Sequence, residues 1–264
     1  MLQLNNVFKL FNPGTPDEKT ALIRINLHLN PGDFVTVIGS NGAGKSTLMN
    51  IISGGYKPDM GEIRIEGQSI GALPEYQRSK WIGRVFQDPM AGTAPHMSIE
   101  ENLAMAFMRG KTRGLRFGVT SSKRTMYREQ LKRLGIGLED RLRAKVGLLS
   151  GGERQALSLL MATFTEPKIL LLDEHTAALD PARAELITRL TESIVREMGL
   201  TTLMVTHNME QAIRLGNRLI MMDKGQIILD ITEERKKDLT VEQLLGEFER
   251  VSGHKLADDR IVLG

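Results

Sequence analysis

Short apolar runs of strand length occur toward both ends of the chain and alternate with segments of helical period. Runs of this kind, bounded by Gly, Pro, Asn and Asp, are typical of strands. They predict strands at residues 2–11, 22–29, 34–38, 61–66, 82–86, 168–172, 201–206, 218–222 and 226–230. Because helical stretches separate several of these strands, we expect a largely parallel sheet with helices on its faces.

The pattern changes between residues 88 and 165, where strand signals disappear. Apolar residues there recur with helical spacing, most clearly over 99–108 and 124–134. This middle part of the chain is therefore predicted to be an inserted helical region.

Capping residues set the limits of further helices. Asp180 is placed to cap a helix over 181–198, whose first position is a proline. Gly54 and Gly55 predict the end of an earlier helix, because glycine readily takes the left-handed conformation that terminates helices. A last helix is expected over 241–251, followed by a loose tail.

Composition narrows the class of protein only moderately. The 264 residues are 41% hydrophobic and 25% charged, which is ordinary for a globular protein with a large core. A net charge of +3 is a weak indication of nucleic-acid binding, and we expect none. The chain lacks cysteine, the layout of a signal peptide and any run of about 20 apolar residues, so a membrane role is expected only through a partner.

The most informative motif is the glycine-rich segment 39–47, which follows the apolar run 34–38 and leads into a helical run. A strand, a G-x-x-x-x-G-K-S segment and a helix in this order are typical of a phosphate-binding loop. The glycines let backbone N–H groups point inward, and the helix start adds further N–H groups. Lys45 supplies a charge for the β- and γ-phosphates, and Ser46 is placed to bind Mg²⁺. The motif predicts nucleoside triphosphate binding.

Two carboxylates follow the buried run 169–172. Since strand side chains alternate, Asp173 and Glu174 are expected to point in different directions. Asp173 is the natural carboxylate on the Mg²⁺ side, and Glu174 is then free to polarise an attacking water. The alternative is that both acids merely end a strand at the surface.

A second anion site is indicated by residues 150–153, Ser-Gly-Gly-Glu, which precede the helical run 156–164. Ser150 can cap this helix, and the glycines expose its N–H groups. Taken alone, the segment is an ordinary capped helix start. Its position ahead of Asp173 and Glu174 favours a phosphate-binding function.

Together these motifs make residues 2–230 resemble the ATP-binding subunit of an ATP-binding-cassette (ABC) transporter, with 150–153 as the signature motif. Four other residues match motifs of the family: Gln87 its glutamine loop, Asp180 its D-loop, His207 its switch histidine, and Phe11 the aromatic residue beside adenine.

The resemblance implies an α/β fold of the P-loop NTPase (RecA-like) type, with a mostly parallel sheet, an N-terminal antiparallel β subdomain and an inserted α-helical subdomain. A single ATPase domain over 1–230 is expected. Its α/β core comprises 1–87 and 166–230, and its helical signature subdomain is 88–165. Residues 231–264 form the C-terminal helix and tail.

The resemblance also implies the site. It assigns hydrolysis to Glu174, His207, Lys45 and Gln87, and Mg²⁺ binding to Ser46, Gln87 and Asp173. The implied ATP contacts are Phe11, Ser40, Asn41, Gly42, Ala43, Gly44, Lys45, Ser46, Thr47, Ser150, Gly151, Gly152, Glu153 and Asp180.

The implied partners are a second nucleotide-binding subunit, identical or different, which closes head-to-tail around two ATP molecules, and separate membrane permease subunits. An extracytoplasmic substrate-binding protein is an indirect partner, and the location is the cytoplasmic side of the cell membrane, peripherally bound. Segments 87–95 and 173–181 resemble a bacterial subgroup that pairs with branched-chain-type permeases, which indicates import and amino-acid cargo.

Two positions depart from the family pattern. Glu153 replaces the usual glutamine of the signature, which affects the ribose contact expected of that side chain but leaves the backbone anion site unchanged. His175 stands where proline commonly follows the catalytic glutamate, and it need not contact the phosphates.

Three alternatives stay open from the sequence. A separate ATPase chain is typical of bacterial importers but also of some lipid or peptide exporters, so export stays open beside import. A regulatory ATPase that acts on nucleic acid or protein machinery shares the cassette, although the interval 48–149 lacks the sustained heptads of the chromosome-maintenance relatives. The basic segment 109–128 is either a solvated face or a surface that approaches acidic lipid headgroups.

Overall fold

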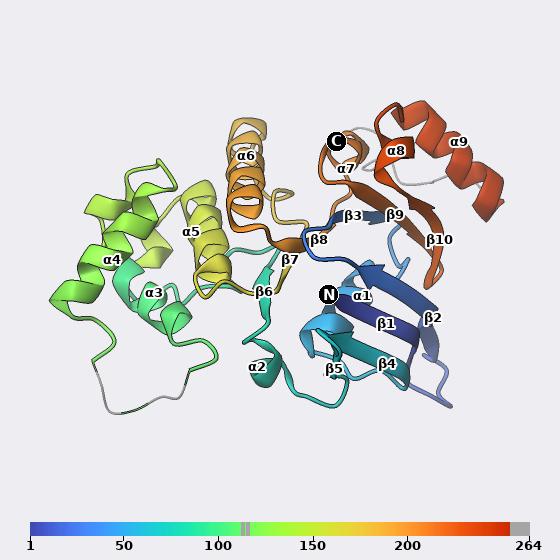
Figure 1. The fold of residues 1–264 in the computed structure, drawn as a ribbon, viewed down its shortest axis with the longest axis horizontal. Coiled ribbons are helices and arrows are strands. Elements are labelled where there is room, and N and C mark those ends of the chain that lie inside the picture. The colour runs from blue at the N-terminus through green and yellow to red at the C-terminus, as the bar shows by residue number, and fades with distance from the viewer. Residues whose placement is uncertain (112–113, 115–116, 254–264) are drawn as a thin grey trace. The chain divides into compact units, whose positions relative to one another are not determined.

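A computed structural model describes residues 1–111, 114 and 117–253 and shows two compact units (Figure 1). Unit 1 is made of residues 1–78 and 199–253, and unit 2 of residues 79–198. Within the described residues, none of the helices has the length and apolar character that a membrane crossing requires.

Unit 1 begins with an antiparallel sheet in the order β2-β1-β4-β5. Its strands are β1 (Leu2–Phe11), β2 (Lys19–Leu29), β4 (Met60–Ile65) and β5 (Gln68–Ser69). Leu2 of the central strand β1 lies opposite Leu29 on one side and Ile65 on the other. All three side chains are fully buried, so this face of the sheet forms part of the core. The expected N-terminal antiparallel β subdomain is confirmed.

Unit 1 also contains strands in the order β10-β9-β3-β8. These are β3 (Phe34–Gly39), β8 (Thr201–Val205), β9 (Arg218–Asp223) and β10 (Gln226–Ile231). Strand β3 is parallel to both β8 and β9, whereas β10 is antiparallel to β9. Every residue of β3 and of β8 is buried, which explains why neither strand contains a charged residue.

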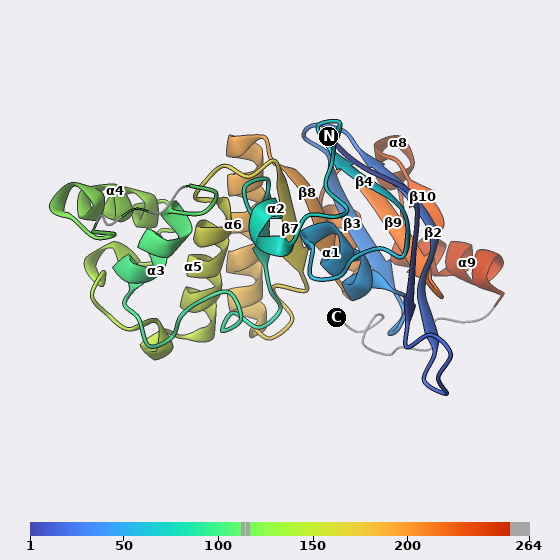
Figure 2. The ribbon, with the colours of Figure 1, turned by 90° about the horizontal axis from the view of Figure 1, so that it is seen from below.

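The helices of unit 1 pack on these strands. They are α1 (Lys45–Ser53), α2 (Glu75–Arg78), α7 (Met209–Arg214), α8 (Glu233–Lys236) and α9 (Val241–Ser252). Helix α1 contacts both β2 and β3, and α9 lies against β10 (Figure 2). Leu244 and Phe248 of α9 are fully buried in a cluster with Ile38 of β3.

The end of α1 is fixed by a buried arginine. Gly54 terminates the helix in the left-handed conformation, with φ of 95°, as expected from the sequence. Arg78, also fully buried, donates hydrogen bonds to four backbone carbonyls, those of Ile51, Ile52, Gly71 and Leu73, at 2.7 to 3.0 Å. It thereby satisfies carbonyls that the last turn of α1 leaves without helical partners.

Unit 2 combines two parallel strands with helices. The strands are β6 (Ile82–Val85) and β7 (Ile169–Asp173). The helices are α3 (Ile99–Phe107), α4 (Ser121–Lys132), α5 (Gly151–Thr163) and α6 (Pro181–Met198), with 3₁₀ turns η1 (Leu138–Asp140) and η2 (Val146–Leu148). Leu103 of α3, Tyr127 of α4, Leu157 of α5 and Ile187 of α6 belong to one fully buried core cluster.

The longer predicted elements are confirmed, with small shifts at their ends. Helix α4 starts at residue 121 instead of 124 because the Thr120 hydroxyl accepts a hydrogen bond from the Lys123 N–H and so caps the helix. The predicted domain boundaries stay predictions, and the expected loose tail lies in part outside the described residues.

Candidate functional site

The glycine-rich loop of unit 1 is held between β3 and α1. Gly39 and Gly44 take positive φ angles of 151° and 102°. At Gly44 a Cβ atom would lie 2.6 Å from the Ala21 carbonyl oxygen, so only glycine allows this approach. The Leu48 N–H donates to the Gly44 carbonyl at 2.8 Å, which starts the helix directly after the loop.

Lys45 is folded back onto the loop that it follows. Its ammonium donates hydrogen bonds to the carbonyls of Gly39 at 2.5 Å and Ser40 at 3.1 Å. The side chain is buried, and a buried cation beside a glycine-rich loop favours a bound anion. Ser46, in the first turn of α1, is exposed, and the Ser40 hydroxyl donates to Asp223 at 3.3 Å.

Phe11, at the end of β1, lies in an aromatic pair. Its ring meets that of the exposed Tyr56 edge-on, with centroids 5.1 Å apart. Asp59 fixes the strand end, because its carboxylate accepts hydrogen bonds from the Leu10 N–H at 2.6 Å and the Lys9 ammonium at 3.0 Å. A flat apolar surface is thus presented at a well-anchored strand end, which suits stacking against a base.

His207 follows β8 between two anchored neighbours. The Thr206 hydroxyl donates to Gln211 Oε1 at 2.7 Å, and Asn208 caps α7 by accepting from the Gln211 N–H at 2.7 Å. The half-buried histidine therefore sits on a rigid turn between a buried strand and a helix start.

In unit 2, the two carboxylates at the end of β7 differ in backbone conformation. Asp173 is the last residue of the strand, and its Oδ2 lies 2.9 Å from Nη2 of Arg84. Glu174 takes the left-handed conformation, with φ of 43°, which is uncommon for a residue with a side chain. The chain therefore turns sharply between the two carboxylates.

His175 is a buried, neutral residue. Its Nε2 lies 3.1 Å from the Thr191 hydroxyl, which itself donates to the Ile187 carbonyl. Because that hydroxyl has only one proton, His175 Nε2 must be the donor in this pair. Burial lowers the pKa of His175 to about 4, so the ring is uncharged at neutral pH.

The signature segment forms a reciprocal cap at the start of α5. The Ser150 hydroxyl accepts from the Glu153 N–H at 3.3 Å, and Glu153 Oε2 accepts from the Ser150 N–H at 2.7 Å. Arg141 contacts the other carboxylate oxygen at 2.6 Å. Partial burial opposes ionisation, but the hydrogen bonds from Ser150 and the charge of Arg141 lower the pKa of Glu153. The carboxylate of Glu153, which stands in place of the family's glutamine, thus contacts Ser150 and Arg141.

The predicted site residues divide between the two units. Unit 1 contains Phe11, the loop 39–47 and His207; unit 2 contains Gln87, the segment 150–153, Asp173, Glu174 and Asp180. Gln87 is exposed and lies two residues after the end of β6. Asp180 caps α6, because its Oδ1 accepts from the Arg183 N–H at 3.1 Å, as the sequence predicted.

Sequence reasoning missed side chains that contact site residues from distant parts of the chain, among them Arg84, Tyr56 and Asp223. Each comes from an element distant in sequence from its partner, so no local motif marks it.

The residues proposed for Mg²⁺ present a hydroxyl, an amide and a carboxylate. Magnesium prefers such oxygen ligands and commonly takes only one or two carboxylates beside substrate phosphates. Within residues 1–111, 114 and 117–253, no group of three or more His, Cys, Asp or Glu side chains could form a metal centre without a substrate. The donor set therefore fits a magnesium ion bound together with a nucleotide.

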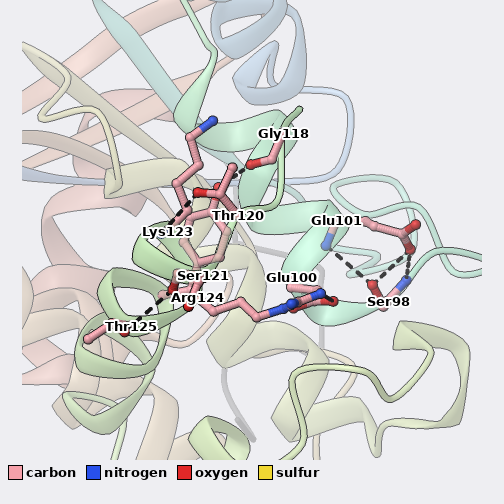
Figure 3. Close-up of polar contacts among 10 residues, drawn as sticks. Ser98, Glu100, Glu101, Gly118, Thr120, Ser121, Lys123, Arg124 and Thr125 are labelled. Atoms are coloured by element: carbon pink, nitrogen blue, oxygen red, sulfur yellow. Dashed lines mark hydrogen bonds and ion pairs between the residues drawn. The ribbon is translucent and has the colours of Figure 1, made fainter. Parts of the chain in front are cut away.

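Three cations of the basic segment, Arg109, Lys111 and Arg124, have partners inside unit 2. Arg124 of α4 forms a two-point ion pair with Glu100 of α3, at 2.6 and 3.1 Å (Figure 3). Arg109 donates to the Ala162 carbonyl at 3.2 Å. The Lys111 ammonium lies 3.5 Å from the centroid of the Phe107 ring. These contacts favour a structural role; residues 112–113 and 115–116 of the segment lie outside the described residues.

A buried parallel strand, a glycine loop with a buried lysine and a following helix define a P-loop NTPase. Residues 22–177 match the family model described as ABC transporter, and this match covers more than half of the chain. The chain belongs to the ABC transporter family, as an ATPase subunit of that family, and the predicted fold class is confirmed.

Individual relatives agree with this membership. The tyrosine transport ATP-binding protein of Clostridioides difficile is 45% identical over 249 residues, which span 94% of this chain and 99% of the relative. The spermidine/putrescine import ATP-binding protein PotA of Haemophilus ducreyi is 32% identical over 94% of this chain, and the chain spans 63% of that relative's length.

A solved structure is similar over most of the chain. It is an ATP-binding cassette, MJ0796, in a dimeric post-hydrolysis state bound to ADP and phosphate. It is 31% identical with a TM-score of 0.76, and the similarity covers 88% of this chain and 99% of that one.

Proposed function

We propose that this ABC ATPase powers an importer of amino acids, with an aromatic amino acid as the favoured cargo. The observation that carries the proposal is the 45% identity, over nearly the full length of both chains, to a tyrosine transport ATP-binding protein. Similarity to an import ATP-binding protein for polyamines supports the direction of transport.

In the proposed reaction, the loop 39–47 binds the triphosphate through its N–H groups and Lys45. Ser46, Gln87 and Asp173 would hold Mg²⁺, which would supply positive charge to the bound triphosphate. Glu174 orients and deprotonates the attacking water. These assignments follow the hydroxyl, amide and carboxylate chemistry of the side chains and their positions at the ends of buried strands.

Three further contacts complete the proposed site. His207 contacts the γ-phosphate from its anchored turn after β8. Phe11 stacks on adenine from the end of β1, and Asp180 contributes from the cap of α6. The remaining proposed ATP contacts in the loop are Ser40, Asn41, Gly42, Ala43, Gly44 and Thr47.

We further propose that two copies, or this chain and a related subunit, close head-to-tail. The start of α5 of one copy, with Ser150, Gly151, Gly152 and Glu153, then faces the γ-phosphate bound by the other. The dimeric state of the similar cassette with ADP and phosphate supports this arrangement. The assembly binds membrane permease subunits on the cytoplasmic side and is served by an extracytoplasmic substrate-binding protein.

Glu174→Gln tests the proposal. The variant keeps the shape of the side chain but cannot accept the proton, so ATP binding is expected to persist while hydrolysis falls by at least about a hundredfold. Size-exclusion chromatography with ATP and Mg²⁺ should then show a stable dimer. A monomer in ATP together with full turnover would contradict the assignment. Uptake of labelled tyrosine by vesicles that contain the permease tests the cargo.

A further inference from the structure

Arg84 and Asp173 are brought together by the register of two buried strands. In the parallel pair β6–β7, Arg84 lies opposite Leu171, and Asp173 is two residues farther along β7. Side chains two residues apart on a strand point to the same face of the sheet. The long side chain of Arg84, which leans along its strand, therefore reaches the Asp173 carboxylate at the end of β7.

The ion pair between them is shielded from water. The Arg84 and Asp173 side chains are only 12% and 15% exposed, and Nη2 lies 2.9 Å from Oδ2. By contrast, the helical pair Arg189–Glu185 is 73% and 39% exposed, and such surface pairs contribute little. Removing one partner of a shielded pair leaves an uncompensated charge, so the Arg84–Asp173 contact fixes where the carboxylate lies.

The guanidinium of Arg84 is also held by an aromatic ring. Its Cζ lies 4.6 Å from the centroid of the Phe86 ring, within the range of a cation–π contact. The carbonyl of Phe86 accepts a hydrogen bond from the buried Gln155 Nε2 of α5 at 3.3 Å. Arg84 thus links Asp173 to the residue that precedes Gln87.

We propose that Arg84 is a positioning residue that acts through Asp173. The guanidinium is a permanent counter-ion of the Asp173 carboxylate, and it competes with the Mg²⁺ of the bound nucleotide for the negative charge of that carboxylate. The proposal rests on the proposed function, because that function makes Asp173 a ligand of the Mg²⁺ that accompanies the nucleotide. A fixed positive charge beside a carboxylate weakens the attraction of that carboxylate for a second cation. Arg84 therefore raises the Mg²⁺ concentration that nucleotide binding requires.

The test is the Mg²⁺ dependence of nucleotide binding by the full chain, without turnover. Binding of a fluorescent ATP analogue to the wild type and to Arg84→Met is followed as Mg²⁺ is titrated. The half-saturating Mg²⁺ concentration is expected to fall about tenfold in Arg84→Met. Arg84→Lys keeps the charge and is expected to stay within about threefold of the wild type. An unchanged value in Arg84→Met overturns the proposal.

Arg124→Met is the matched control, since it breaks another ion pair of unit 2, that between Arg124 and Glu100 (Figure 3). It should leave the half-saturating Mg²⁺ concentration unchanged, and an equal shift in this control would overturn the proposal by showing a general effect of charge. If wild-type binding does not depend on Mg²⁺ at all, the proposed metal role of Asp173 itself fails.

A second measurement does not need nucleotide. Urea unfolding midpoints of Arg84→Met, Asp173→Asn and the double variant form a thermodynamic cycle. The double variant is expected to lose clearly less stability than the sum of the two single losses, because each single change removes the same ion pair and leaves a shielded charge unpaired. Strictly additive losses would overturn the proposed pairing even if Arg84→Met bound nucleotide poorly.

Discussion

At the residue scale, the buried side chains of Lys45, Arg78 and Lys236 all donate hydrogen bonds to backbone carbonyls. The Lys236 ammonium is buried and donates to the carbonyls of Leu215 and Gly216, directly after α7. The partial negative charge at the end of the helix offsets part of the cost of burying a cation there. No motif predicts this contact, because Lys236 lies among other charged residues in a polar segment.

Lys236 predicts a pH-dependent stability. Burial lowers its pKa to about 8 from an ordinary value of 10.5. Below pH 8 the group is charged in both states, so its contribution does not change with pH. Between pH 8 and 10.5 the unfolded chain binds more protons than the folded one, so the free energy of unfolding rises with pH.

The measurement is urea unfolding of the wild type and Lys236→Met across this range. The wild type should gain up to about 3 kcal/mol relative to the variant as the pH rises from 8 to 10.5. A difference between the two proteins that stays constant with pH would rule out the lowered pKa.

The candidate site shows where sequence reasoning ends at this scale. Asp173 and Glu174 could be predicted because they end a conspicuous apolar run. Arg84 could not, because its role depends on the register between β6 and β7, and a shift of one residue would turn its side chain to the other face.

At the scale of elements, the helices and strands that could be predicted have either a regular apolar repeat along their length or a capping residue at one end. Helix α6 begins at Pro181 and ends at Met198, as Asp180 and its apolar spacing indicated. The missed elements are β5, α2, α7, α8 and the turns η1 and η2, which have two to six residues each. Such short pieces form through tertiary contacts, as the buried Arg78 at the end of α2 illustrates.

The loop between β3 and α1 yields a prediction about its glycines. Gly42 and Gly44 both have positive φ angles, but only at Gly44 would a Cβ atom collide with backbone, the Ala21 carbonyl. Gly42→Ala should therefore cost about 1 kcal/mol of backbone strain, and Gly44→Ala distinctly more, because β2 must move. Urea unfolding of both variants checks this; equal losses would show that α1 and β2 are less closely packed than described.

At the scale of the whole molecule, neither unit contains all the residues proposed for ATP hydrolysis. Unit 1 supplies the triphosphate loop and His207, and unit 2 supplies Glu174 and the signature segment. The kinds of element that make up the fold could be predicted from the sequence, because motifs and apolar periods are local. The division into units at residues 78 and 199 could not, since it depends on the sum of contacts made by many side chains.

The head-to-tail assembly predicts a specific cross-link between copies. Because the chain has no native cysteine, Ser40→Cys and Ser150→Cys introduce unique thiols with little change in size. In the Glu174→Gln background, a short bis-maleimide should join two copies in ATP and Mg²⁺, and should not join them in ADP. Each single cysteine variant serves as the control. Equal yields with ATP and with ADP would contradict closure driven by ATP.

The anchoring of Arg78 has a mechanical consequence. This residue ends the first of the two chain segments that form unit 1, and its guanidinium donates hydrogen bonds to the Ile51 and Ile52 carbonyls, near the end of α1. The polypeptide enters unit 2 at the very next peptide bond. Tension applied to the backbone at that junction therefore passes through two short hydrogen bonds into the far end of the phosphate-loop helix.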